Sequence, residues 1–209
     1  MKLADGCCAC KGCAPHQRSL MSTVRVLEMQ LSEPGASERS STSTFFDGTD
    51  PPDVTMTRYV HRFVHYHDFF EWPVLTIALI YMRRIQQSRP EHRLNMYNVH
   101  RMLCAAFVLA YKFAIDEVHT NAAMGKLGGI GKVDEMNRIE MYALDSIDWK
   151  THVTAEEFWQ AAVEFDQADA PATERIADLD AGTIESVFHE DVAQNVYDED
   201  FLVRVFEME

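Results

Sequence analysis

The longest apolar run in the chain lies between Val99 and Phe113, and every residue from Met102 to Tyr111 within it is apolar. Neither glycine nor proline interrupts the run. A helix that is hydrophobic on all sides has no face for water, so other elements of the same fold must enclose it. The run is also too short to cross a bilayer, which needs roughly 20 apolar residues. The pattern therefore predicts a central core helix with other helices packed around it.

Apolar residues recur at helical spacing on both sides of this run. The helices that this spacing predicts cover Ser22–Leu31, Thr55–His67, Trp72–Gln87 and Val133–Ile147, with a short helix or turn before Gly128. A last helix begins at Thr154, where the hydroxyl caps the chain and Glu157 is expected to reach back in a capping box. The body of the chain shows no convincing strand and no fixed-period repeat, so the expected fold class is all-α.

Acidic residues are concentrated in the last quarter of the chain. Ala155–Glu209 holds 16 acidic and 2 basic residues, and its balance of -14 equals the net charge of all 209 residues. The body is therefore neutral, which argues against a nucleic-acid partner, since such binding needs clustered lysine and arginine. We expect the acidic quarter to be solvated surface, with an electrostatic guide for a basic partner as the alternative.

The N-terminal region is rich in cysteine and lacks the apolar stretch of a secretory signal. With no transmembrane run elsewhere, the expected location is intracellular, in the cytoplasm or nucleus. Four cysteines crowd together at Cys7, Cys8, Cys10 and Cys13, and we expect reduced thiols on a mobile tail. Metal binding or reversible acylation of this cluster remain the alternatives.

Motifs of known catalytic sites are absent from the sequence. It contains no G-x-x-x-x-G-K-[ST], G-x-S-x-G, H-E-x-x-H or G-x-G-x-x-G. His61 and His65 have the i, i+4 spacing of metal ligands, but a third ligand of clear spacing is missing, which favours solvent-facing or interface histidines. These motifs therefore give no candidate catalytic residue, and no cofactor or metal site is expected.

Lys112 and Glu140 are two charges at the edges of apolar segments. Glu140 has no cation three or four residues away, and a carboxylate beside an apolar surface needs a partner if water is excluded. Lys112 has only Asp116 at i+4, in the weaker order. Spacing alone leaves two readings open for the pair: joint binding of a partner, or a dipole-matched helix end and an exposed acid.

Several blocks of sequence together resemble the successive blocks of a single-box cyclin of the phosphate-pathway (P/U) type, similar to kinetoplastid cyclins. They are T-F-F-D-G-T-D-P-P, T-R-Y-V-H-R-F, L-I-Y-M-R-R, N-V-H-R-M-L-C-A-A-F-V-L-A-Y-K-F, T-N-A-A-M-G-K-L-G-G-I and E-M-N-R-I-E. The resemblance spans about Thr23 to Phe158, and the order of the blocks is more specific than any single one. It departs from the class at Arg83. The class usually has an aspartate at this position, which pairs with an arginine on the first box helix. Arg62 is the nearest match to that arginine.

The resemblance implies a five-helix cyclin box with one extra N-terminal helix and no catalytic activity of its own, so the protein is not expected to be an enzyme. In cyclins a lysine at the end of the third box helix and a glutamate on the fifth jointly hold the kinase, and Lys112 and Glu140 match them. Phe113, Leu144 and Trp149 match apolar positions on the same face. The expected function is a cyclin that binds and activates a cyclin-dependent protein kinase, as in the cell cycle and cell division. The alternative is a cyclin-box scaffold that binds another protein without activating a kinase.

The expected organisation has four parts. Residues 1–21 form the mobile Cys-rich tail, 22–54 the N-terminal helix and a polar linker, 55–166 the cyclin box, and 167–209 the acidic C-terminal extension.

Overall fold

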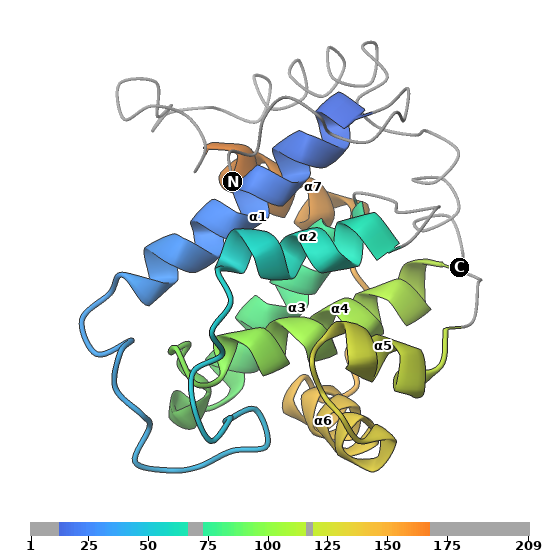
Figure 1. The fold of residues 1–209 in the computed structure, drawn as a ribbon. Coiled ribbons are helices and arrows are strands. Elements are labelled where there is room, and N and C mark those ends of the chain that lie inside the picture. The colour runs from blue at the N-terminus through green and yellow to red at the C-terminus, as the bar shows by residue number, and fades with distance from the viewer. Residues whose placement is uncertain (1–12, 67–72, 116–118, 168–209) are drawn as a thin grey trace.

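The computed structural model describes residues 13–66, 73–115 and 119–167 (Figure 1). Within these ranges the chain forms seven α-helices, a short 3-10 helix and no strand, so the predicted all-α class is confirmed. The helices are α1 (Cys13–Leu31), α2 (Met56–Tyr66), α3 (Pro73–Ser88), α4 (Val99–Ala114), α5 (Asn121–Leu127), α6 (Val133–Ser146) and α7 (Ala155–Gln167), with the 3-10 helix η1 (Pro90–His92) after α3.

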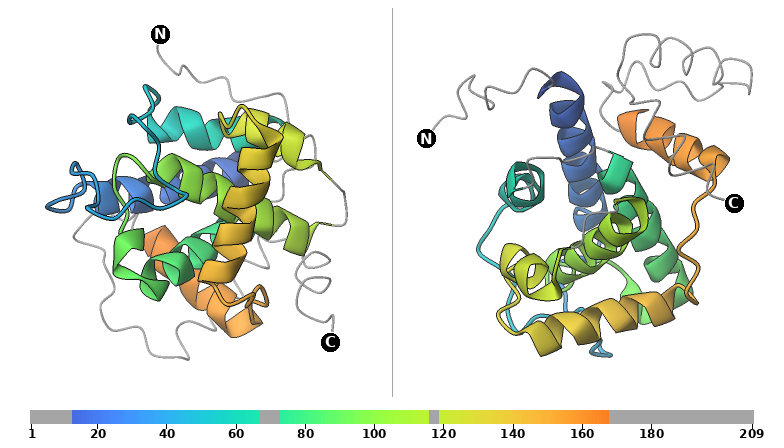
Figure 2. Two further views of the ribbon diagram at one scale, coloured as in Figure 1. Left: turned by 90° about the horizontal axis from the view of Figure 1, so that it is seen from below. Right: turned by 90° about the vertical axis from the view of Figure 1, so that its right-hand side faces the viewer.

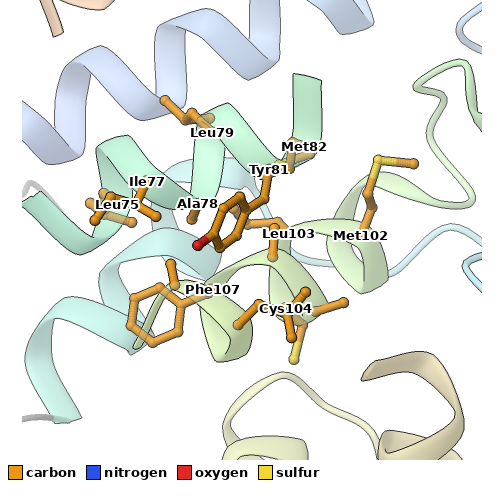
Figure 3. Close-up of a cluster of buried hydrophobic side chains, with 14 of the residues drawn as sticks. Leu75, Ile77, Ala78, Leu79, Tyr81, Met82, Met102, Leu103, Cys104 and Phe107 are labelled. Carbon is orange, nitrogen blue, oxygen red and sulfur yellow. The ribbon is translucent and has the colours of Figure 1, made fainter. Parts of the chain in front are cut away.

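Helix α4 lies at the centre of the structure, as its apolar sequence predicts. Every residue from Met102 to Tyr111 is buried. Helix α3 packs most extensively against it, and α5 and α6 contact it on other sides (Figures 1 and 2). Figure 3 shows the resulting cluster, in which Tyr81 and Leu103 lie between α3 and α4. On the side of α2, the rings of Phe63 and Phe107 are 4.6 Å apart.

Helix α1 begins at Cys13, so the prediction of a helix start at Ser22 was wrong and part of the predicted tail is helical. Pro15 stands in the first turn, where its missing N–H costs no hydrogen bond. The helix packs on α2, α3 and α7 and buries Leu27 fully. The residues before Cys13, with the other three cysteines of the cluster, lie outside the described residues.

Arg83 of α3 connects this helix to α7. Its guanidinium forms an ion pair with Glu164 at 2.6 Å and lies over the ring of Phe165. In cyclins of this class an aspartate at this position pairs with an arginine, and Arg62 matches that arginine. Arg62 lies instead over the ring of Tyr59. An ion pair to α7 therefore stands where the cyclin pattern has a pair between the first two box helices.

Thr154 caps α7 as predicted, and its hydroxyl accepts a hydrogen bond from the backbone N–H of Glu157 at 3.2 Å. The expected capping box is not completed, because the Glu157 carboxylate pairs with Arg84 of α3 at 2.6 Å. The same guanidinium donates to the carbonyl of His152 at 3.0 Å. A charged partner on another helix has thus replaced the local backbone contact that the motif predicts.

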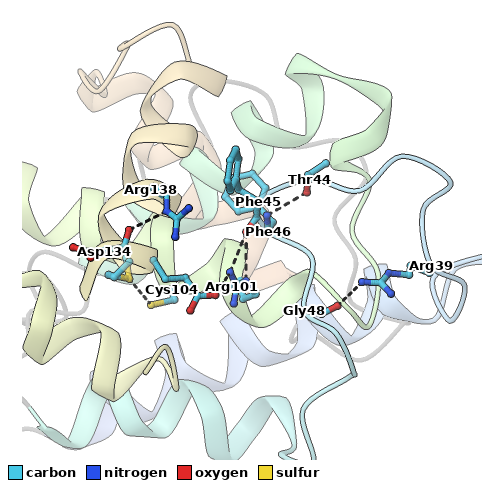
Figure 4. A network of polar contacts seen from close by, with 11 residues as sticks. Arg39, Thr44, Phe45, Phe46, Gly48, Arg101, Cys104, Asp134 and Arg138 are labelled. Atoms are coloured by element: carbon cyan, nitrogen blue, oxygen red, sulfur yellow. Dashed lines mark hydrogen bonds and ion pairs between the residues drawn. The ribbon is translucent and has the colours of Figure 1, made fainter. Parts of the chain in front are cut away.

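The segment between α1 and α2 packs against the start of α4 (Figure 4). Ala36 is buried and its carbonyl accepts a hydrogen bond from the N–H of Met96 at 2.9 Å, so this part of the predicted polar linker is more than a spacer. Arg101 of α4 donates to the carbonyl of Phe45 at 3.3 Å, and Phe46 is fully buried. Phe46 thus anchors this segment in the core, while Phe45 beside it is 51% exposed.

Gly128 ends α5 at a point where α4 and α2 come very close. A Cβ at this position would lie 2.2 Å from Sγ of Cys104, and the Tyr59 hydroxyl donates to the Gly128 carbonyl at 3.0 Å. Burial raises the pKa of the Cys104 thiol to about 12, so this group stays a neutral packing element. The K-L-G-G-I block therefore has a packing reason: only glycine fits between the helices here.

Replacing Gly128 by alanine tests this packing. We expect Gly128→Ala to lower the free energy of unfolding by roughly 1 to 3 kcal/mol through overpacking, measured by chemical denaturation. Cys104→Ala removes the clashing sulfur, so the double variant should lose clearly less than the sum of the two single variants. Gly131→Ala is the matched control, since no atom lies within 4 Å of its added Cβ. Additive losses would contradict the proposed clash.

His92 joins the end of α3 to α6 and is completely buried. Its Nδ1 lies 3.0 Å from the carbonyl of Ile85, which only accepts, so Nδ1 carries the proton and Nε2 accepts from the Tyr142 hydroxyl at 2.9 Å. Burial lowers the pKa of His92 below its ordinary value of 6.5. The neutral ring is therefore the form that the fold holds.

This lowered pKa predicts a pH dependence of stability. Below the ordinary pKa of about 6.5 the unfolded chain binds more protons than the folded one. The stabilisation is therefore complete above that pH and is lost as pH falls through the lower pKa of the folded state. We expect His92→Gln to reduce the fall in stability between pH 7 and pH 5, measured by denaturation at each pH. Burial also lowers the pKa of His100, so some slope should remain. Identical slopes in both proteins would show that His92 does not contribute.

Candidate partner-binding site

Lys112 and Glu140 form an ion pair between two helices. Lys112 stands in the last turn of α4, where the helix leaves the core, and Glu140 stands in the middle of α6. Nζ of Lys112 lies 2.6 Å from Oε1 of Glu140. The glutamate side chain is only 12% exposed and the lysine 41%. The cation that Glu140 lacks three or four residues away on its own helix is thus supplied by the end of the core helix.

Two asparagines complete this polar cluster, and the sequence analysis missed both. Asn121 accepts a hydrogen bond from Lys112 at 2.9 Å and donates to Glu140 and, at 2.8 Å, to Asn137. A signal was present for Asn137, which precedes Glu140 by three residues and so shares its face of α6. Asn121 gave no such signal, because its contacts depend on how α5 packs.

The apolar residues of the predicted site lie at the same two helix segments. Phe113 follows Lys112, Leu144 lies one turn after Glu140, and both are half-buried and pack against the core. Trp149 lies just after α6, and its backbone N–H donates to the Leu144 carbonyl at 2.9 Å. Its side chain is 57% exposed. The structure therefore places a large uncovered aromatic ring near the end of the helix that carries Glu140.

The turn that presents Trp149 has an unusual backbone. Asp148 and Trp149 have φ angles of 51° and 59°, in the left-handed region that side chains with a Cβ rarely adopt. The indole N–H of Trp149 donates to the Asp145 carboxylate at 3.0 Å. Such conformations are disfavoured and gather at functional sites. The turn thus holds a costly backbone geometry around an exposed tryptophan.

Among the described residues no group of three or more histidine, cysteine, aspartate or glutamate side chains is arranged to hold a metal ion. The side chain of His65, the second member of the histidine pair, lies outside the described side chains.

In the described part of the chain, no helix has both the length and the apolar character needed to span a membrane.

These observations define an all-helical box that presents a salt-bridged lysine and glutamate with apolar neighbours on its surface. The chain belongs to the cyclin family, whose family model matches residues 15–151. Cyclins as a family are regulatory proteins rather than enzymes.

Plant cyclins are among the relatives that match the chain. Cyclin-P3-1 of Oryza sativa is 34% identical over 125 residues, which cover 60% of this chain and 52% of the relative. Cyclin-U2-2 of Arabidopsis thaliana is 28% identical over 141 residues, covering 68% and 59%. This chain thus spans only about half to three fifths of these two proteins.

A third relative is matched over more of its length. Cyclin-U4-2 of Arabidopsis thaliana is 26% identical over 182 residues, covering 87% of this chain and 82% of the relative. The names of these relatives confirm the resemblance to P- and U-type cyclins. The likeness to kinetoplastid cyclins stays a prediction.

Proposed function

We propose that this chain is the regulatory subunit of a cyclin-dependent protein kinase, which it binds and activates through Lys112, Phe113, Glu140, Leu144 and Trp149. The observation that carries the proposal is the ion pair of Lys112 and Glu140 at the surface of a cyclin box. Phe113 directly follows Lys112, Leu144 lies one turn after Glu140, and the exposed Trp149 lies just after the same helix. A surface of this composition fits a protein partner, since aromatic anchors next to desolvated charges dominate protein interfaces.

In this proposal, the ion pair of Lys112 and Glu140 contributes more free energy to kinase binding than to folding. A partly exposed ion pair stabilises a folded protein by about 0.2 to 1 kcal/mol, because water screens the charges. A partner that covers the pair removes that water, and loss of either charge then leaves the other one buried and unpaired. The two charges therefore contribute mainly to the stability of the complex, in which the kinase covers them.

Activation follows from selective binding to one kinase conformation. A protein kinase transfers phosphate only when its own lysine–glutamate ion pair and activation segment are in place. A rigid helical surface that binds this conformation more tightly than others shifts the population towards it. The kinase supplies every catalytic group, and this chain supplies differential binding energy. A kinase partner also fits the intracellular location that the sequence predicts.

Alanine substitutions test the proposed site. We expect Lys112→Ala and Glu140→Ala each to weaken kinase binding by roughly 2 to 5 kcal/mol, which is about 30-fold to several thousand-fold in affinity. The measurement is the histone-kinase activity that the tagged full chain recovers from cell extract. Glu33→Ala is the matched control, because its ion pair with Arg93 is 3.4 Å long and both side chains are more than half exposed, at 59% and 63%.

A charge swap separates binding from stability. In the variant Lys112→Glu with Glu140→Lys, the two side chains still attract each other, so we expect stability close to that of the unmodified chain. Kinase recovery should still be lost, since each charge stands where its opposite stood. Full kinase recovery by the double alanine variant would refute the site. Bound partners without any kinase activity would favour the scaffold instead.

A further inference from the structure

Asn121 contacts both charged groups of the proposed kinase-binding pair. It is the first residue of α5, and its Oδ1 accepts a hydrogen bond from Nζ of Lys112 at 2.9 Å. Its Nδ2 donates to Oε2 of Glu140 and, at 2.8 Å, to Oδ1 of Asn137. One neutral amide thus connects the end of α4 and the middle of α6 from a third helix.

Only one orientation of the Asn121 amide satisfies these neighbours. An ammonium group only donates hydrogen bonds and a carboxylate only accepts them. If the amide were turned over, its NH2 would face Lys112 and its oxygen would face Glu140, and both contacts would be lost. In the observed orientation both carboxylate oxygens of Glu140 are used, Oε1 by Lys112 and Oε2 by Asn121. The amide therefore matches this cation and this anion specifically.

We infer that Asn121 is a positioning residue for kinase binding, which fixes the Lys112 ammonium and the Glu140 carboxylate in one geometry before the partner arrives. The inference rests on the proposed function. Lysine and glutamate side chains have many rotamers, and ordering them during association weakens binding. Asn121 removes part of that freedom in the unbound chain, and Asn137 in turn orients Asn121.

Substitutions at Asn121 test this role. We expect Asn121→Ala to weaken kinase binding roughly tenfold, the equivalent of one charge-assisted hydrogen bond. Asn121→Asp has nearly the same shape but places a second carboxylate beside Glu140, so it should weaken binding more than alanine does. Binding by Asn121→Asp equal to that of the unmodified chain would overturn the inference.

A matched control separates positioning from loss of structure. Thr154 caps α7, a helix that does not carry the cluster, and its hydroxyl accepts a hydrogen bond from the N–H of Glu157. Thr154→Ala should therefore lower stability while it changes kinase binding less than twofold. Equal losses of binding in Thr154→Ala and Asn121→Ala would show a merely structural effect and would overturn the inference.

A measurement without the kinase keeps this inference separate from the proposed function. In the free full chain, the side-chain amide signals of Asn121 in an NMR spectrum should shift in Lys112→Met and in Glu140→Gln. Unchanged signals would overturn the inference. If the alanine variants of Lys112 and Glu140 lose kinase binding but Asn121→Ala does not, only the positioning role fails. If those variants bind normally, the proposed function fails, whatever the amide signals show.

Discussion

The structure depends on the burial of a helix that has no side for water. From Met102 to Tyr111, α4 presents only apolar side chains, and the fold must cover them from every direction. Helices α3, α5 and α6 pack against it, and α2 contacts it through the rings of Phe63 and Phe107, which fixes the places of these helices relative to one another. Lys112 is the first charged residue after this run. Its position at the margin of the core is therefore set by the same constraint.

The parts of the fold that depend on local pattern were predictable from the sequence. The inner face of α6, with Met136, Ile139 and Ala143, follows from helical spacing, and all three are buried. The start of α1 was missed because residues 13–21 lack an apolar period, although Pro15 is typical of a first turn. The ion pair of Glu157 with Arg84 was missed for a different reason. Its partner on α3 is distant in sequence, and no local motif reveals such a contact.

The charged pair of the candidate site and its apolar neighbours were predicted from the sequence, but the two asparagines were not. Spacing left Lys112 and Glu140 open to two readings, and the cyclin resemblance favours the one in which they bind a partner. The structure brings their charged atoms to 2.6 Å. Asn121 and Asn137 were missed because a neutral amide leaves no unpaired charge in the sequence that needs a partner. Their roles arise from the meeting of three helices, which only packing determines.

Helix α5 links the packing of the core to the geometry of the site. It has seven residues, far fewer than a helix needs to be stable alone, so its position depends on what holds its two ends. At one end Gly128 fits closely against Cys104 and Tyr59. At the other end Asn121 is bonded to the charged pair. With a rise of 1.5 Å per residue these ends are only about 10 Å apart. A change in the core that displaces α5 must therefore also displace the amide that orients Lys112 and Glu140.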